Sequence, residues 1–263
     1  MLFAISTLAF ADPAEEAALL PLLKRAGVDA LEVAPTKRWP RWAGADSASA
    51  KRYREALLSA GFRVTALQSI VFEQPQLQLF GADFAPWLAH FQTLSEIAEG
   101  LGARTLVFGA PQQRDPGDCA EPLALAAERF RALATQLQAS GAVLALEPVP
   151  ESRFIQTPAQ AQQLAASVAH PAFDWHFDSA AWAQSGADLG ALLAVRLPPH
   201  AHLSQPQLVG PLSGPVDLLE VILKLRTHGY AQAFSFEILS GRHHWPTTLD
   251  SIERLIGAAR DAS

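Results

Sequence analysis

Short apolar runs alternate with amphipathic stretches along the whole chain. The runs have the length of buried strands, and the stretches between them repeat apolar residues at the helical period. Eight runs recur along the 263 residues, ending near Ser6, Ala34, Ser69, Gly109, Glu147, Asp178, Ser204 and Ile238. Strands that alternate with helices in this way predict parallel βαβ units. We therefore expect an α/β fold, a (β/α)₈ TIM barrel.

The stretches between the runs carry helix start and stop signals. Asp12-Pro13 begins the first helix, and Gly27 ends it. The later helices are expected at 46–60, 83–101, 121–140, from Thr157-Pro158, at 188–194, from Gly214-Pro215 and at 247–258. No low-complexity linker interrupts the series, so we expect one domain over residues 1–263. A doubly wound open sheet is the alternative, but eight even units with acidic strand ends favour the barrel.

The apolar N-terminal segment has two interpretations. Leu2–Phe10 ends in a small-x-small pattern like that of a signal peptide, but no Lys or Arg precedes Lys24. We interpret Leu2–Ser6 as a buried first strand instead. No apolar run reaches the roughly 18 residues of a membrane span. We therefore expect a cytoplasmic protein without a membrane partner.

Composition narrows the range of partners. The net charge is −6, so the chain lacks the basic balance that a nucleic-acid groove needs, and a small polar ligand fits better. A homo-oligomer is compatible with the sequence. The single cysteine, Cys119, excludes a disulfide framework and a thiolate-rich zinc site.

Polar residues end four successive strands on the face where TIM barrels carry their active sites. These residues are Glu147, Asp178, His202 and Glu237. Any one of them could be an ordinary polar strand end, but four in succession predict a shared metal site. Three carboxylates and one imidazole suit one divalent cation, with Mn²⁺ first and Mg²⁺, Co²⁺ or Zn²⁺ as further candidates. The summed charge of about −1 lets one carboxylate take up a proton as a general base.

Short motifs around these residues carry a family resemblance. They are Leu144–Pro148 (LALEP), His202–Pro206 (HLSQP), Phe234–Glu237 (FSFE) and Leu106–Pro111 (LVFGAP). In their order and spacing the chain resembles the sugar phosphate isomerase/epimerase group of the xylose-isomerase-like TIM barrel family. The likeness extends over nearly the whole chain.

The resemblance implies roles for the four residues. In ketose 3-epimerases of this group, the matching positions hold the metal, and the two glutamates exchange a proton on opposite sides of a substrate carbon. By that likeness Glu147 and Glu237 are the acid/base pair, and Asp178 and His202 are ligands only. The function implied is a metal-dependent isomerase or epimerase of a sugar or keto-polyol, by proton transfer next to a metal-bound carbonyl.

The sequence departs from those epimerases at two substrate-binding positions. Ala181 stands where they carry a His, and Leu208 stands where they carry an Arg. Substrate identity is therefore not carried over. A lyase or dehydratase, acting through the same site on a keto-sugar or oxidised glycoside, is the main alternative. An apurinic-site endonuclease of this fold would need further histidines and a basic face, and a non-catalytic barrel would not need four metal-type residues.

Four further residues are candidates for substrate binding. Glu32 ends the second strand and either binds a substrate hydroxyl or pairs with a nearby base, while Gln68 ends the third strand. Arg153 and Arg114 lie on loops above the expected barrel mouth. Either arginine could receive a phosphate or carboxylate, or simply be solvated.

Overall fold

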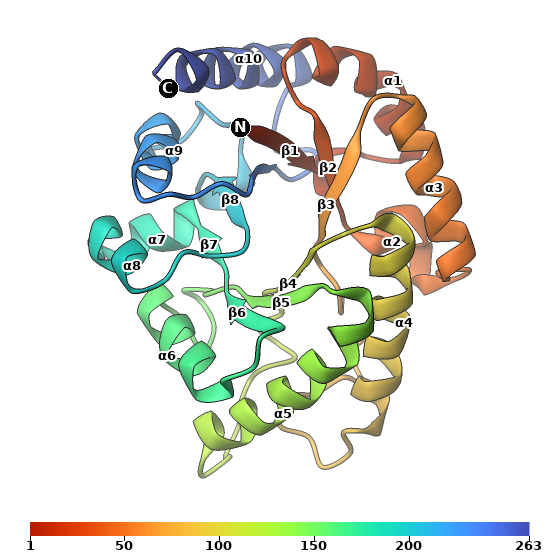
Figure 1. Cartoon of the computed structure of the whole chain (residues 1–263), viewed down its shortest axis with the longest axis vertical. Helices are drawn as coiled ribbons and strands as arrows, with labels where there is room; N and C mark the ends of the chain where they lie inside the picture. Colours follow the sequence, from red (N-terminus) through yellow and green to blue (C-terminus); the bar gives the residue numbers. More distant parts are fainter. Residues whose placement is uncertain (263) are drawn as a thin grey trace.

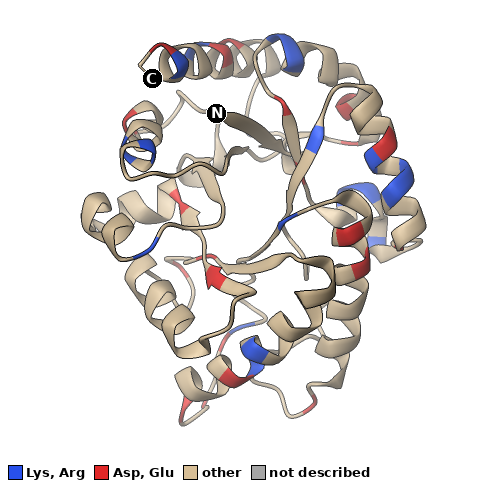
Figure 2. Ribbon diagram, in the orientation of Figure 1, with Lys and Arg blue, Asp and Glu red and all other residues tan. Residues whose placement is uncertain are grey.

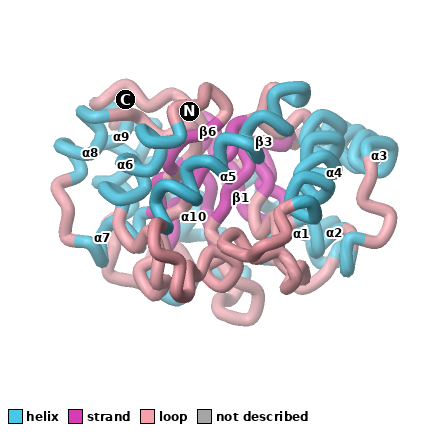
Figure 3. Tube along the Cα trace, turned by 90° about the horizontal axis from the view of Figure 1, so that it is seen from below, coloured by secondary structure: helices cyan, strands magenta, loops and turns pink. Residues whose placement is uncertain are grey.

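Parallel strands wind round a central axis and are enclosed by helices in the computed structural model, which describes residues 1–262 (Figures 1 and 3). The strands are β1 (Leu2–Ser6), β2 (Ala30–Val33), β3 (Arg63–Leu67), β4 (Thr105–Phe108), β5 (Val143–Leu146), β6 (Phe173–Trp175), β7 (Phe177–Asp178), β8 (Ala201–Ser204) and β9 (Ala233–Glu237). Because β1 pairs with both β2 and β9, the first and last strands meet. The expected TIM barrel and its first strand are confirmed.

The sixth strand position is divided at His176. Its first half, β6, pairs with β5, and its second half, β7, pairs with β8. The His176 N–H donates to the Leu146 carbonyl at 2.8 Å, and the Phe177 N–H faces the His200 carbonyl at 3.4 Å. The strand thus passes from one neighbour to the other at His176. Nine short strands occupy the eight positions that the sequence predicts, and the barrel is nearly closed.

Helices surround the barrel in chain order. They are α1 (Pro13–Arg25), α2 (Pro35–Arg38), α3 (Ser47–Ser59), α4 (Ala85–Leu101), α5 (Pro122–Leu137), α6 (Pro158–Val168), α7 (Ser179–Ser185), α8 (Leu189–Val195), α9 (Leu218–Thr227) and α10 (Trp245–Asp261). Short 3₁₀ turns lie at Thr7–Ala9, Pro40–Trp42, Gln138–Ser140 and Pro206–Leu208. Side-chain caps at Asp12, Asp46 and Thr157 begin α1, α3 and α6. The sequence did not predict α2 and α7, in which no helical period is apparent.

The barrel interior is polar near the carboxyl ends of the strands. Phe3 stacks with Phe234 and Phe236 on the side of the strands that faces the helices, with centroids 5.7 and 6.1 Å apart. Strand residues two apart share a face, so the opposite side of β9 and β1 carries small or polar residues such as Ser235 and Ser6. TIM barrels more often fill this space with branched aliphatic side chains. Here the interior leads directly into the candidate site.

Positive charge lies away from that interior. Figure 2 shows Lys and Arg mainly on the outer helices, including α3 and α10. Within residues 1–262, no helix combines the length and apolar character needed to cross a membrane.

Two helical glycines give a test of the packing. A Cβ on Gly100 of α4 would lie 2.7 Å from the Ala50 Cβ and 2.8 Å from the Ser47 carbonyl oxygen, both on α3. Gly257 of α10 has nothing within 4 Å of the same position. We expect Gly100→Ala to lower the free energy of unfolding by about 1–3 kcal/mol through overpacking. Gly257→Ala should raise it by about 0.5–1 kcal/mol.

Urea denaturation of both variants would measure these shifts. Equal effects at the two glycines would contradict the close approach of α3 and α4.

Candidate metal centre and active site

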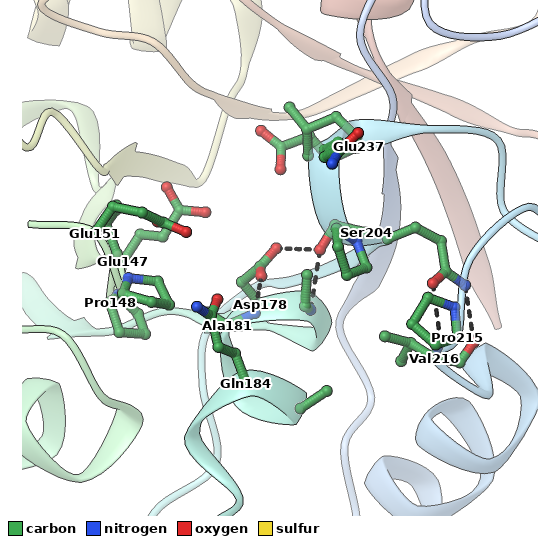
Figure 4. A pocket seen from close by; sticks show the side chains of 18 residues that line it. Glu147, Pro148, Glu151, Asp178, Ala181, Gln184, Ser204, Pro215, Val216 and Glu237 are labelled. Atoms are coloured by element: carbon green, nitrogen blue, oxygen red, sulfur yellow. Dashed lines mark hydrogen bonds between the residues drawn. The ribbon is translucent and has the colours of Figure 1, made fainter.

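The four expected metal ligands come together at the carboxyl ends of β5, β7, β8 and β9. Glu147, Asp178, His202 and Glu237 each offer one donor atom, and these atoms all lie within 4.8 Å of one another. Figure 4 shows the three carboxyl groups facing the same space from separate strands. Only alternation along the strands is needed to explain their direction, because each side chain continues the inward face of its strand.

A buried hydrogen bond fixes the His202 ring. Its Nε2 lies 3.0 Å from both carboxylate oxygens of Glu32, and Ser235 donates to the same carboxylate at 2.7 Å. Burial alone would raise the pKa of Glu32, but the charges of His202 and His200 lower it to about 2. An ionised carboxylate only accepts, so Nε2 is the donor. The lone pair of Nδ1 is then directed away from Glu32 and is available for a metal.

The Nδ1 atom of His202 faces the carboxylates directly. It lies 3.3 Å from Oε1 of Glu147, 3.4 Å from Oε2 of Glu237 and 4.0 Å from Oδ2 of Asp178. It is fully buried and has no hydrogen-bond partner of suitable geometry in the described chain. A buried, unpartnered nitrogen among carboxylate oxygens is suited to bind a cation together with them.

The electrostatics of the cluster also fit a cation. Burial raises the pKa of Glu147, Asp178 and Glu237, and the neighbouring carboxylates raise each of them further, that of Asp178 to about 6. Burial lowers the pKa of His202, but Glu32 and Glu237 outweigh this and hold it well above its usual range. The carboxylates carry a surplus of negative charge. Either a proton on Nδ1 or a divalent ion in its place would compensate that charge.

Asp178 is held by both of its oxygens. Its Oδ1 accepts from the Ala181 N–H at 2.7 Å and so caps α7, while its Oδ2 accepts from the Ser204 hydroxyl. Ser204 is fixed in turn, because its own N–H donates to Ser179 Oγ at 2.8 Å. The ligand is therefore oriented by the start of a helix and by the neighbouring strand.

The position of Glu147 depends on two neighbours, Gly109 and Arg114. A Cβ at Gly109 would lie 2.5 Å from Glu147 Oε2, so any larger residue there would require this carboxyl group to shift. Arg114 is fully buried, and its guanidinium donates to the Glu147 and Ile155 carbonyls at 2.9 and 3.3 Å. Burial lowers the pKa of Arg114 to about 10. Arg114 thus supports the backbone of the loop that follows β5.

A cavity of about 810 Å³ opens above the cluster. It is lined by Glu147, Pro148, Val149, Pro150, Glu151, Asp178, Ala180, Ala181, Ala183, Gln184, Ser204, Gln205, Pro206, Gln207, Leu208, Pro215, Val216 and Glu237. Ala181 and Leu208, the two departures from the epimerase pattern, are thus in contact with the space where a substrate would bind. Volumes of this size are typical of small-molecule sites.

The four candidate substrate-binding residues lie elsewhere. Glu32 is beneath His202, and Gln68 donates to the Ser6 hydroxyl inside the barrel. Arg153 is two-thirds exposed and pairs with Asp115 at 3.1 Å. With Arg114 buried against backbone carbonyls, none of the four lines the cavity. For Glu32 the structure favours the alternative of pairing with a base, and the substrate contacts of all four stay predictions.

Three contributors to the site were not recognised in the sequence. Ser235 and Ser204 lie two residues from Glu237 and His202, respectively, so the strand period alone could have placed them on the inward face. Gly109 directly follows β4 and lies beside Glu147, and a glycine at such a place signals close approach of another group. Gln205 has a different role. Its side-chain amide bonds to the backbone of Pro211 and Val216 and so holds that loop in place.

The fold and the cluster define a TIM barrel with clustered metal-type ligands at its carboxyl end. Residues 20–257 match the family described as xylose isomerase-like TIM barrel, which covers most of the chain. The chain belongs to this family. Among curated protein sequences, none matches it significantly.

Solved structures share the fold at low sequence identity. A D-psicose 3-epimerase, solved in the presence of D-fructose, superposes with a TM-score of 0.79 at 18% identity, covering 99% of both chains. The probable 3-DHS dehydratase AsbF from Bacillus anthracis gives 0.76 at 15%, covering 98% of this chain and 99% of that one. The IolI protein with a bound zinc atom gives 0.71 at 17%, covering 99% and 96%.

The hydrogen bond between Glu32 and His202 generates a prediction about metal affinity. We expect Glu32→Gln to weaken binding of Mn²⁺ by about 10–100-fold, because the loss of the acceptor charge frees the ring and lowers its basicity. Competition with a fluorescent chelator would measure the change.

Asp174→Asn is the matched control. Asp174 is also a buried acid on the sixth strand, but it pairs with Arg196 at 2.8 Å and takes no part in the cluster. Equal weakening in both variants would show that the effect is a general loss of stability.

Proposed function

We propose that this protein is a divalent-metal-dependent isomerase or epimerase of a neutral sugar or keto-polyol. The observation that carries the proposal is the pair Glu147 and Glu237, whose carboxylates lie 3.3 and 3.4 Å from the same nitrogen of His202. Two carboxylates that flank one candidate metal position can act on two faces of a single substrate carbon. The similarity to a D-psicose 3-epimerase supports this class of reaction.

Glu147, Asp178, His202 and Glu237 would hold the ion. A bound divalent cation polarises a carbonyl and makes the adjacent C–H acidic. Carboxylate-rich sites with one imidazole favour Mn²⁺, and Mg²⁺, Co²⁺ and Zn²⁺ are compatible. The IolI structure, which shares the fold, contains a bound zinc atom, and this supports a divalent metal in this protein.

The two glutamates would move the proton. Burial raises the pKa of both carboxyl groups, which brings their proton affinity closer to neutral pH and suits them to general acid–base work. One of them removes the proton from the carbon next to the carbonyl. Return of a proton by the other to the opposite face inverts that carbon, and return by the same group along the enediol gives isomerisation.

The lining of the cavity favours an uncharged substrate. None of its described lining residues is Lys or Arg, and Glu151 adds a negative charge. Arg114 and Arg153 are engaged by carbonyls and by Asp115, respectively, so neither is available to bind a phosphate without rearrangement. Ala181 and Leu208 offer apolar surface where a free ketose would need polar contacts.

A lyase is the second candidate. The same first proton transfer can be followed by loss of a β-substituent instead of reprotonation. The similarity to a probable dehydratase and the apolar side chains at Ala181 and Leu208 support this reading. Both reactions begin with removal of the same proton, so one experiment tests their common step.

Metal content provides the first test. Protein purified without chelator should contain about one equivalent of divalent metal, and His202→Ala should weaken retention about 10-fold or more. Elemental analysis after dialysis measures both. His228→Ala is the control, because this exposed histidine contacts the Lys224 carbonyl at the end of α9. Full retention in a His202→Ala, Asp178→Ala double variant would contradict the assignment.

Solvent exchange provides the second test. With a panel of ketoses, keto-polyols and oxidised glycosides in D₂O, deuterium should enter the carbon next to the carbonyl of any compound that is accepted. Glu147→Gln or Glu237→Gln should lower that rate by about 10²–10⁴, since the shape is kept and the base is lost. Glu151→Gln is the control, because Glu151 lines the cavity outside the cluster.

Proton NMR follows the exchange directly. Exchange that survives both cluster substitutions would mean that these glutamates do not transfer the proton.

A further inference from the structure

A second cavity lies beside the first, between the loops that follow β3 and β4. It has a volume of about 550 Å³. It is lined by Ser69, Ile70, Val71, Phe72, Glu73, Gln74, Pro75, Val107, Gly109, Ala110, Pro111, Gln112 and Gln113. The proposed proton transfer uses none of these side chains, so the cavity requires a separate explanation.

Gly109 brings the second cavity next to Glu147. Gly109 lines the second cavity, and a Cβ on it would lie 2.5 Å from Glu147 Oε2 and 3.8 Å from a methyl carbon of Val149. Glu147 and Val149 both line the first cavity. The carboxyl group of Glu147 therefore stands at the boundary. A substrate whose reacting carbon meets Glu147 can extend into the second cavity.

The walls of the second cavity are held in an uncommon backbone conformation. Ser69, Glu73 and Ala110 have φ values of 54°, 62° and 42°, in the left-handed region that residues other than glycine rarely adopt. Such conformations are retained where the surrounding structure enforces them, and they concentrate at ligand-binding sites. The shape of this cavity is therefore defined by the fold.

The chemistry of the walls fits a neutral ring. Ile70 and Val71 are buried apolar side chains, and the side chain of Phe72 is 60% exposed. The polar side chains are those of Ser69, Glu73, Gln74, Gln112 and Gln113. The Glu73 carboxylate accepts from the Arg41 N–H at 2.9 Å, and no Lys or Arg is among the described lining residues. An exposed phenyl ring beside apolar walls suits a flat aromatic group, which can stack on it. The amides can bind hydroxyl groups on the ring or at its edge.

We propose that the second cavity is an aglycone site. The substrate is then a neutral glycoside whose oxidised sugar ring meets Glu147 and whose aromatic aglycone lies against Phe72. This inference rests on the proposed function for the position of the sugar, and it specifies the substrate class of that same site.

Binding of unreactive glycosides tests the proposal without turnover. Phenyl β-D-glucopyranoside and methyl β-D-glucopyranoside lack a carbonyl, so isothermal titration calorimetry on the Mn²⁺-loaded protein measures binding alone. We expect the phenyl glycoside to bind about tenfold more tightly, as burial of a phenyl group implies. Equal dissociation constants would overturn the proposal.

Substitutions in the cavity localise that preference. Phe72→Ala and Val71→Ala, which truncate apolar walls of the second cavity, should each reduce the tenfold ratio, and the double variant should bring it close to one. Leu58→Ala is the matched control, because it truncates an apolar side chain of similar exposure on α3, outside both cavities. A ratio unchanged in the double variant would contradict the assignment. Tighter binding of cellobiose than of the phenyl glycoside would also contradict it.

Failure of this inference can be separated from failure of the proposed function. The two tests have different readouts, because deuterium exchange reports on Glu147 and the binding ratio reports on Phe72. Exchange that depends on Glu147, together with a ratio of one, would overturn the aglycone site alone. A tenfold ratio in a protein that exchanges no ketose, keto-polyol or oxidised glycoside would uphold the aglycone site and overturn the proton transfer.

Discussion

The hydrogen bond from His202 to Glu32 is the constraint on which the rest of the site depends. Both side chains are fully buried at the centre of the barrel, and the bond determines which ring nitrogen faces the carboxylates. Removing one partner of a buried ion pair commonly costs about 3–5 kcal/mol, because the other charge is left uncompensated. Two further side chains contact the buried Glu32 carboxylate: Ser235 donates a hydrogen bond to it, and Nε2 of His200 lies 3.9 Å from it. The candidate metal centre and the polar barrel core are therefore one connected structure.

The sequence predicted the parts of the site that depend on local pattern. Strand-helix alternation gave the barrel, and inspection of the strand ends found Glu147 and the three residues that cluster with it. The pattern did not reveal what Glu32 contacts, because its partner His202 lies 170 residues away across the barrel. Arg114 was ambiguous for a related reason: a loop arginine shows no sign in the sequence that it will be buried against carbonyls.

Irregular backbone set the other limit on prediction. No helical period is apparent in α7, and the sixth strand divides at His176, where its pairing passes from β5 to β8. The sequence pattern therefore revealed neither feature. Positive φ at Ser69 and Glu73 is equally invisible, since residues other than glycine give no signal for it. These loops shape the second cavity, and that cavity could therefore be recognised only in three dimensions.

The double role of Asp178 has a consequence for how substrate range could diverge. One oxygen caps α7 and the other accepts from Ser204, while the same helix presents Ala181 and Gln184 to the first cavity. Substitutions that shift α7 to accommodate a new substrate would also turn a ligand of the cation. Selection for new specificity along this wall is therefore coupled to metal affinity. The loop after β3 holds none of the four ligands, and it offers a freer route to altered preference.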